Sequence, residues 1–212
     1  MAATVTEDQP TFTEKTAFAN IVRFPVVGDD NLIETKPFLD ACSGVLSVLD
    51  KLGSAFSVPK KDVQGNIKRV TECYETDPNL YKTVNVFMEK KQSPGSLLWL
   101  KRALQFLLAF IDSILQDHIN GTEKESLRQN VLQAYEPTLK PYHGKMTQFL
   151  FSNISRLVPH RKDFLVAMLS EPDATLDMVF HDLQLYLPDF RRNVQIVNDL
   201  LVQHGLDEQK VV

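Results

Sequence analysis

Three polar side chains in the segment 62–69 have a spacing that suits a ligand with several hydroxyl groups. Asp62, Asn66 and Arg69 are separated by four and three residues, so on a helix they share one face. A carboxylate accepts hydrogen bonds from two hydroxyls, a carboxamide both donates and accepts, and a guanidinium adds a fork of donors. Together they could clamp a polyol. The alternative is a solvated helix face with Asp62 in the first turn, where the helix dipole favours a carboxylate.

The single tryptophan, Trp99, could complete such a site, because an indole stacks on the apolar C–H face of a sugar ring. It could equally be a core filler. Trp99 lies in the segment 93–115, where apolar residues occupy nearly every helical face from Ala103 onward. This pattern predicts a central helix that other helices surround.

The start of this central helix is indicated by Ser93, whose hydroxyl can cap a backbone N–H, and by Pro94, which fits the first helical position. Trp99, Lys101 and Arg102 then follow within two turns. We expect this end of the helix to return toward the surface and to carry any functional site.

The rest of the chain shows apolar residues at three- and four-residue spacings, which predict further helices. They cover approximately residues 35–52, 60–76, 80–91, 123–156, 163–169, 172–186 and 188–204. Pro137 and Pro141 should bend the long helix that contains them, because each removes an internal hydrogen bond. No alternating β pattern of useful length is present. The sequence therefore predicts an all-α protein of about eight helices.

Composition limits both domain number and partners. The chain has 212 residues, of which 43% are apolar and 24% charged, enough for one well-buried core. We expect an irregular, polar N-terminal arm over 1–30, a single domain over 31–212, and a loose tail over 205–212. The formal charge of -4 argues against a nucleic-acid partner.

Three sequence features predict a cytoplasmic protein. Cys42 and Cys73 lie in apolar helical contexts and have no partners at metal-binding spacing, which indicates reduced core residues. No secretory signal is visible at the N-terminus. No apolar run reaches the roughly 18 residues that span a bilayer, so any membrane contact should be peripheral.

Catalytic signatures are absent from the sequence. It contains no G-x-S-x-G elbow, phosphate-binding loop, H-E-x-x-H or C-x-x-C motif. The five histidines do not form a zinc-ligand pattern. We therefore expect neither an enzyme nor a bound metal or cofactor.

Five segments, in order and in register, resemble the glycolipid transfer protein family over roughly residues 31–204. They are L-G-S (52–54), D-V-Q-G-N-I-K-R (62–69), L-L-W-L-K-R-A-L-Q-F (97–106), A-Y-E-P-T-L-K-P-Y-H-G (134–144) and R-K-D-F-L (161–165). The resemblance implies a two-layer helical sandwich that encloses an apolar lipid pocket. It also implies a soluble carrier that moves glycosphingolipids between membranes without vesicles and without chemistry.

The resemblance assigns roles to the polar residues by position. Asp62 matches the aspartate that holds the ceramide amide N–H and a sugar hydroxyl, Asn66 matches the sugar-binding asparagine, and Trp99 matches the stacking tryptophan. Arg69 stands where the animal protein usually has lysine, so charge is kept while hydrogen-bond geometry can change. His143, in Y-H-G, matches the histidine that binds the ceramide carbonyl; without the resemblance it reads as a core residue.

Two further sets of residues follow from the same comparison. Arg102, in the W-L-K-R motif, is expected to support the site electrostatically. The residues expected along the acyl chains are Leu49, Phe56, Phe151, Ile154, Phe164 and Met168. Most phenylalanines of a helical protein are simply core, so periodicity alone does not locate a lipid tunnel.

The head group is inferred from a contrast within the superfamily. A sister branch binds ceramide-1-phosphate through D-x-x-x-K and two arginines four residues apart. Here Asn66 follows Asp62 at the fourth position, and Leu98 lies four residues before Arg102. A phosphate would find few cations, so the sequence favours a neutral sugar and leaves a phosphosphingolipid as the alternative.

Two departures from the family concern the membrane surface. Lys145 replaces a tryptophan that enters the bilayer, and the tail lacks a terminal tyrosine, so transient membrane contact would depend on other residues such as Phe149, Lys140 and Tyr142. Two other function classes remain open: a glycolipid-sensing interaction module, and a helical enzyme or scaffold with a vestigial site.

Overall fold

The computed structural model describes residues 11–212, and in these residues every regular element is helical. The predicted all-α class is confirmed. The described residues form ten α-helices and two short 3₁₀ turns, more than the predicted eight. Two expected helices are each broken into two and a further single-turn helix is present, while the last two expected helices are joined into one.

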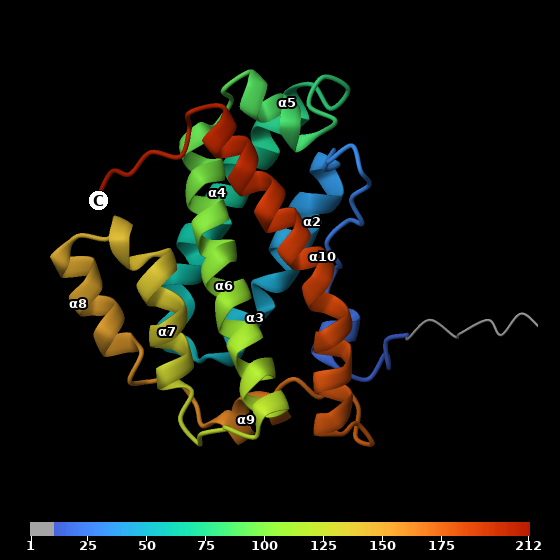
Figure 1. The fold of residues 1–212 in the computed structure, drawn as a ribbon, viewed down its shortest axis with the longest axis vertical. Coiled ribbons are helices and arrows are strands. Elements are labelled where there is room, and N and C mark those ends of the chain that lie inside the picture. Colours follow the sequence, from blue (N-terminus) through green and yellow to red (C-terminus); the bar gives the residue numbers. More distant parts are fainter. Residues whose placement is uncertain (1–10) are drawn as a thin grey trace, which may run out of the picture.

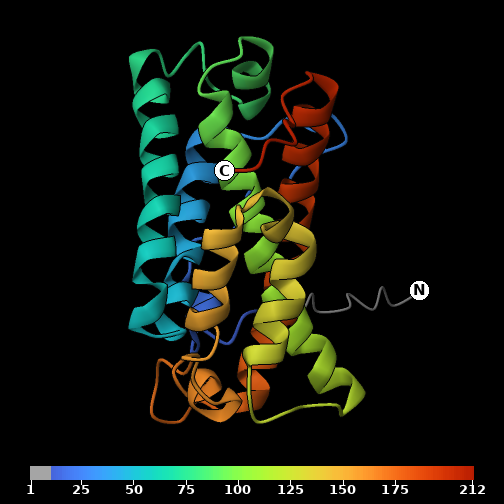
Figure 2. The same cartoon turned by 90° about the vertical axis from the view of Figure 1, so that its left-hand side faces the viewer.

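The long helices form two layers, which are best seen in Figure 2. One layer contains α2 (Thr35–Val45), α3 (Ser47–Lys51) and α4 (Ser57–Thr76). The other contains α6 (Pro94–Asn120), α7 (Arg128–Thr138) and α10 (Leu176–Gln203). The shorter elements are α1 (Ala17–Asn20), η1 (Ser54–Phe56), α5 (Val84–Glu89), η2 (Lys140–Tyr142), α8 (Lys145–Ile154) and α9 (Arg161–Val166). Figure 1 shows α6 between α7 and α10, with α5 and α9 at opposite ends.

Helix α6 is the central helix that the sequence predicted. Leu104, Phe110, Ile111 and Ile114 are almost fully buried, and α4, α7 and α10 all pack on this helix. Its start differs in detail from the prediction. Ser93 is in the left-handed backbone conformation (φ 45°) and its hydroxyl caps no N–H, so the helix begins on the fixed φ of Pro94 alone.

Proline has opposite effects at two places. The segment 123–156 is not one bent helix: α7 ends at Thr138, directly after Pro137, and α8 starts only at Lys145. In contrast, Pro188 lies inside α10, where two helices were predicted. Tyr186, Leu187 and Phe190 are buried on both sides of this proline, so burial of a continuous apolar stripe outweighs the one lost hydrogen bond.

The end of α2 is the other break in a predicted helix. The chain turns at Leu46 and continues as α3, whereas the sequence pattern indicated one helix over 35–52. Gly53 then adopts φ 97°, a left-handed conformation that glycine accepts without a steric penalty. The turn directs the following helix, α4, back along the core.

The described part of the N-terminal arm packs on the helices. Phe18 and Phe24 are buried, and Thr13 and Thr16 donate their hydroxyls to the buried carboxylate of Asp182 at 2.6 and 2.7 Å. Residues 1–10 of the predicted arm lie outside the described residues. The division into an arm and a domain at residue 31 stays a prediction.

The end of the helical layers nearest α9 is held together by a polar cluster. Arg161 at the start of α9 is buried, donates to Asp117 on α6, and donates to the backbone oxygen of Lys124 at 2.8 Å. Asn130 on α7 donates to the same Asp117 carboxylate at 2.8 Å. Burial opposes ionisation of Asp117, but the hydrogen bonds from Asn130 and Arg161 outweigh it and lower the pKa of Asp117.

Over residues 11–212, none of the helices combines the length and apolarity needed to cross a bilayer.

Candidate functional site

A cavity of about 840 Å³ lies where α4, the first turns of α6 and the α7–α8 corner meet. This volume is near the upper end of the roughly 300–1,000 Å³ typical of small-molecule sites. All five residues predicted to bind a head group line it, namely Asp62, Asn66, Arg69, Trp99 and His143. Its other lining residues are Ala55, Val58, Pro59, Lys61, Val63, Gly65, Ala103, Leu139, Thr147, Leu150, Phe151, Ile154 and Val212.

Asp62 presents a free carboxylate to this cavity. Because α4 begins at Ser57, Asp62 lies in the second turn, so the first-turn explanation for an aspartate here does not apply. Within residues 11–212, no side chain makes a hydrogen bond or ion pair with Asp62. Both of its oxygens are therefore available to accept hydrogen bonds from a ligand.

Arg69 is held across the gap between α4 and α6. Its Nε donates to the hydroxyl of Ser96 at 2.9 Å, and its Nη2 donates to the amide oxygen of Asn66 at 2.6 Å. A lysine could not make both bonds from one planar group. Arg69 uses one of the two lone pairs of the Asn66 oxygen, and the amide NH₂ of Asn66 keeps both of its N–H donors for a ligand.

Trp99 is fixed from behind by Arg102. The guanidinium carbon of Arg102 lies 4.9 Å from the centre of the Trp99 ring and 3.4 Å from the centre of the Tyr142 ring, which places the cation between two aromatic rings. Lys101 and Arg102 are only 2% and 1% exposed. The expectation that these cations lie near the surface is wrong, because both are neutralised and covered by the end of the chain.

The segment after α10 covers this part of α6. The carboxylate of Asp207 lies 3.0 Å from Lys101 Nζ, and Arg102 donates to the backbone oxygen of Glu208. Farther along, Val212 donates its N–H to Tyr142 at 2.9 Å and accepts from the Gly144 N–H at 2.6 Å. The predicted loose tail is therefore bonded to both sides of His143.

His143 is half-buried between Trp99 and Tyr135. Its ring is nearly parallel to the Trp99 ring, with centroids 5.8 Å apart, and its Nδ1 is 3.0 Å from the Tyr135 hydroxyl. Burial lowers the pKa of His143, the nearby charge of Arg102 lowers it further, and the charge of Asp62 partly opposes both. At neutral pH His143 is therefore an uncharged imidazole with one N–H donor.

The six residues predicted along the acyl chains divide into two groups. Phe151 and Ile154 line the cavity directly. Leu49, Phe56, Phe164 and Met168 are buried in the core and do not line it. Phe151 connects the groups, because its ring lies edge-on to Phe56 at a centroid distance of 6.4 Å. The apolar side of the cavity is therefore in direct contact with the core through Phe151.

Four residues of the site were not identified from the sequence. Lys61 lines the cavity beside Asp62, Ser96 holds Arg69, Tyr135 contacts His143, and Asp207 neutralises Lys101. Only Lys61 had a usable signal, since it directly precedes the polar stripe that Asp62, Asn66 and Arg69 form on α4. The others depend on contacts that only the folded chain brings about, between residues 27, 8 and 106 positions apart.

Comparison with known proteins identifies the family of this chain. The sequence model of the family described as Glycolipid transfer protein (GLTP) matches residues 33–170, more than half of the chain. The chain belongs to the glycolipid transfer protein family. Its members are lipid transfer proteins, and the cavity lies within the matched region apart from Val212.

Curated relatives include family members of two lengths. The zebrafish (Danio rerio) Glycolipid transfer protein is 30% identical over 190 residues, which cover 84% of this chain and 91% of that protein. The human Pleckstrin homology domain-containing family A member 8 is 32% identical over 221 residues, covering 96% of this chain. The chain matches only 41% of that longer protein, and 36% of its zebrafish counterpart.

Solved structures share the fold closely. The GLTP-fold structure of FAPP2, described as selecting simple glycosphingolipids, has a TM-score of 0.81 at 30% identity and covers 93% of this chain and 100% of that one. The structure of HET-C2, a fungal glycolipid transfer protein, has a TM-score of 0.73 at 26% identity and covers 89% of this chain and 94% of that one. The structure of mouse ceramide-1-phosphate transfer protein has a TM-score of 0.75 and covers 91% of this chain and 95% of that one. At 21% identity this likeness shows the fold alone.

The electrostatic arrangement around His143 makes a prediction about its titration. Replacing Asp62 by asparagine removes a negative charge that favours the imidazolium, while burial and Arg102 continue to disfavour it. We therefore expect the pKa of His143 to fall further below its usual range in Asp62→Asn. The measurement is an NMR titration of the His143 Cε1–H resonance.

A matched control is Asp50→Asn, which removes a carboxylate paired with Lys60 at 2.6 Å and not among the charges acting on His143. This variant should leave the titration unchanged. A rise in the His143 pKa in Asp62→Asn, or equal titration curves in all three proteins, would contradict the described geometry.

Proposed function

We propose that this protein binds a glycosphingolipid and carries it between membranes without vesicles. The sugar lies over Trp99 within reach of Asp62, Asn66 and Arg69, and His143 donates to the ceramide carbonyl. The ceramide chains enter the apolar end beside Phe151. The single observation that carries this proposal is that one cavity is lined both by polar groups that can bind hydroxyls and by apolar residues that pack against the core.

The energetics of a ceramide explain why a carrier needs this combination. Each CH₂ is worth roughly 0.8 kcal/mol, so moving a sixteen-carbon chain into water costs on the order of 13 kcal/mol. An apolar cavity replaces the bilayer and removes most of that cost. The free energy of an alkyl chain is then nearly the same in the membrane and in the protein. Selection among lipids depends on the polar end, where each neutral hydrogen bond contributes about 1 kcal/mol.

The polar end suits a sugar for a specific reason. Asp62 is an acceptor with no internal partner in the described chain, whereas Asn66, Arg69 and His143 have N–H donors available. A sugar hydroxyl both donates and accepts, so neighbouring hydroxyls can satisfy both kinds of group. A ceramide amide also both donates and accepts: its N–H can donate to Asp62, and its carbonyl oxygen can accept from His143.

A phosphosphingolipid such as ceramide-1-phosphate is the second candidate, and one observation favours it. Lys61 and Arg69 both line the cavity, and within residues 11–212 neither forms an ion pair. A phosphate could use both cations. However, Asn66 stands where the phosphate-binding branch has its lysine, and Leu98 stands where that branch has one of its two arginines, so the sugar remains the better fit.

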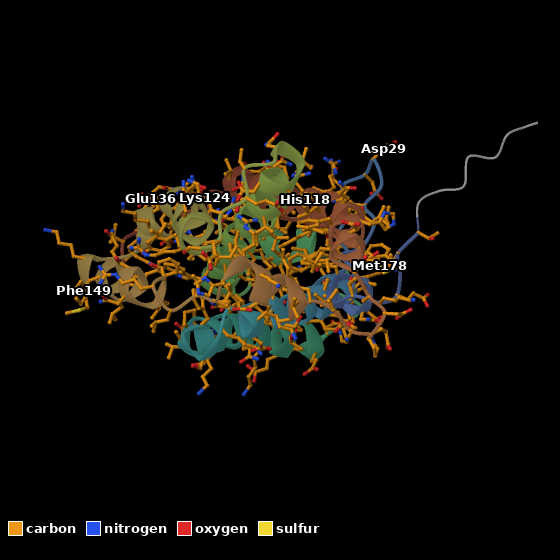
Figure 3. The ribbon with its side chains drawn as sticks, turned by 90° about the horizontal axis from the view of Figure 1, so that it is seen from below. Asp29, His118, Lys124, Glu136, Phe149 and Met178 are labelled. Carbon is orange, nitrogen blue, oxygen red and sulfur yellow. The ribbon has the colours of Figure 1, made fainter. Side chains whose placement is uncertain are left out.

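Transfer also requires the cavity to meet a membrane, and we assign this contact to α8. Met146, Phe149 and Leu150 are 72%, 64% and 55% exposed on this one helix, and Leu150 lines the cavity. Figure 3 shows Phe149 at the outer edge of the molecule, pointing away from the helices. Exposed large apolar side chains grouped in this way mark interaction surfaces. Lys145 begins the same helix and can approach lipid phosphates.

Two residues predicted for docking have other contacts. Tyr142 stacks on Arg102, and Lys140 forms an ion pair with Glu136 at 2.7 Å. Of the three docking residues inferred from the sequence, we retain only Phe149. The carrier acts by binding and release rather than by catalysis, and we place it in the cytoplasm, where donor and acceptor membranes are both accessible.

A glycolipid sensor that passes a signal to a protein partner would use the same cavity. It would bind glycolipid tightly and transfer little. A helical enzyme or scaffold with a vestigial site would not bind lipid at all. Measuring binding and vesicle-to-vesicle transfer on the same sample separates these two classes from a carrier.

The first functional prediction concerns Asp62. Asp62→Val should abolish transfer of fluorescent galactosylceramide between vesicles, because it removes a carboxylate with two ligand hydrogen bonds. Bonds to a charged group contribute about 1.5–3 kcal/mol each, so a loss of at least tenfold is expected. Helical content measured by circular dichroism should not change, since Asp62 is exposed.

The control is Asp40→Val on α2, which removes a carboxylate paired only with the exposed Lys36. This surface pair contributes little, so transfer should stay near that of the wild type. Undiminished transfer in Asp62→Val would reject the proposed sugar site.

The second functional prediction separates docking from binding. Phe149→Asp should reduce sedimentation with phosphatidylcholine vesicles, and with it transfer, by on the order of tenfold, because burying a phenylalanine contributes about 1.5–3 kcal/mol. Capture of galactosylceramide from detergent should be unaffected. Val202→Asp alters an equally exposed apolar residue on α10 and should change neither property. If Phe149→Asp binds vesicles as well as the wild type, α8 is not the docking helix.

A further inference from the structure

Behind His143 lies a residue that does not itself line the cavity. Tyr135, on α7, is 3% exposed, and its hydroxyl lies 3.0 Å from His143 Nδ1. Its ring is stacked on Phe151, with centroids 3.7 Å apart and planes inclined by 9°. The phenol is therefore fixed by ring packing on one side and has a single polar contact at its other end.

The direction of this hydrogen bond follows from the surroundings of the hydroxyl. Burial and the charge of Glu136 raise the pKa of Tyr135 to about 12, so the hydroxyl keeps its proton at neutral pH. In the described residues, His143 is the only hydrogen-bond partner of this hydroxyl. If Nδ1 carried the proton, the buried O–H would have no acceptor, which is costly. Donation from Tyr135 to Nδ1 satisfies both groups.

A neutral imidazole that accepts at Nδ1 must carry its proton on Nε2. We propose that Tyr135 is a positioning residue: its hydroxyl fixes His143 as the Nε2–H tautomer and so leaves one N–H for a carbonyl oxygen of the bound lipid. The tautomer depends on the geometry of the protein alone. The consequence for the lipid rests on the proposed function.

Fixing the tautomer prevents a specific error in recognition. With the proton on Nδ1, His143 would offer only a lone pair to the cavity, and a carbonyl cannot donate to it. Asn66 is oriented similarly, because its oxygen accepts from Arg69 and both N–H groups of its amide are left as donors. These two contacts add donors around the carboxylate acceptor of Asp62. Such a site favours the orientation of a lipid amide in which its N–H faces Asp62 and its carbonyl faces His143.

The test is the tautomeric state of His143 in the full chain, read from long-range ¹H–¹⁵N correlation NMR with ¹⁵N-labelled histidine. The wild type should show an unprotonated Nδ1 and a protonated Nε2. Tyr135→Phe keeps the ring stacked on Phe151 but removes the hydroxyl, so Nδ1–H should become populated. Tyr142→Phe is the control, since Tyr142 contacts Arg102 rather than Nδ1, and should leave the tautomer unchanged.

The second measurement is galactosylceramide capture by native mass spectrometry. Tyr135→Phe should capture it about fivefold less well than the wild type, as expected for loss of one neutral hydrogen bond. A protonated Nδ1 in the wild type, an unchanged tautomer in Tyr135→Phe, or undiminished capture by that variant would overturn the inference. Failure of the wild type to capture any galactosylceramide would instead reject the proposed function, while the wild-type spectrum would still decide the tautomer.

Discussion

The packing of α4 against α6 is the contact on which the site depends. The buried positions of α4 are Val63, Ile67 and Val70, and each directly follows one residue of the polar stripe. Successive residues of a helix are rotated by about 100°, so the polar stripe lies along the flank of the buried stripe. Once Val63 and its neighbours pack, Asp62 must face the groove beside Trp99 and not the solvent on the far side of α4.

In the proposed function, this arrangement separates two tasks. The apolar residues would surround hydrocarbon and distinguish poorly among lipids, because one methylene resembles the next. The polar end would discriminate among head groups, and the chain stiffens this end with contacts that do not face the cavity. Ser96 holds Arg69, Arg102 supports Trp99, and Tyr135 contacts His143. Such support keeps the donors in place before a ligand arrives, which lowers the entropy lost on binding.

Features that depend on residues close together in the sequence could be predicted, whereas features that depend on contacts between residues far apart in the sequence could not. Apolar spacing identified α6, because its burial on nearly every side leaves a continuous apolar pattern. Local patterns failed where tertiary packing decides the outcome: Pro188 lies inside α10, and Lys101 is buried. Lys101 is neutralised by Asp207, which lies 106 residues later in the chain, and no local pattern indicates that pairing.

The same limit applies within the site. The polar stripe on α4 could be read from spacing, while the roles of its residues came from resemblance to a family. Tyr135 lies inside one of the quoted segments, yet its contact with His143 exists only because the chain turns between α7 and α8. A sequence pattern does not specify that turn closely enough to place a hydroxyl against one ring nitrogen.

The most direct test of the account is a competition among head groups. Native mass spectrometry of the protein mixed with equal amounts of galactosylceramide, lactosylceramide and ceramide-1-phosphate ranks them in one spectrum. We expect the complexes with the two sugar-bearing lipids to dominate, because Asp62 is free to accept from hydroxyls and because Asn66 and Leu98 stand where the phosphate-binding branch has cations. A spectrum dominated by ceramide-1-phosphate, or one without any lipid complex, would contradict it.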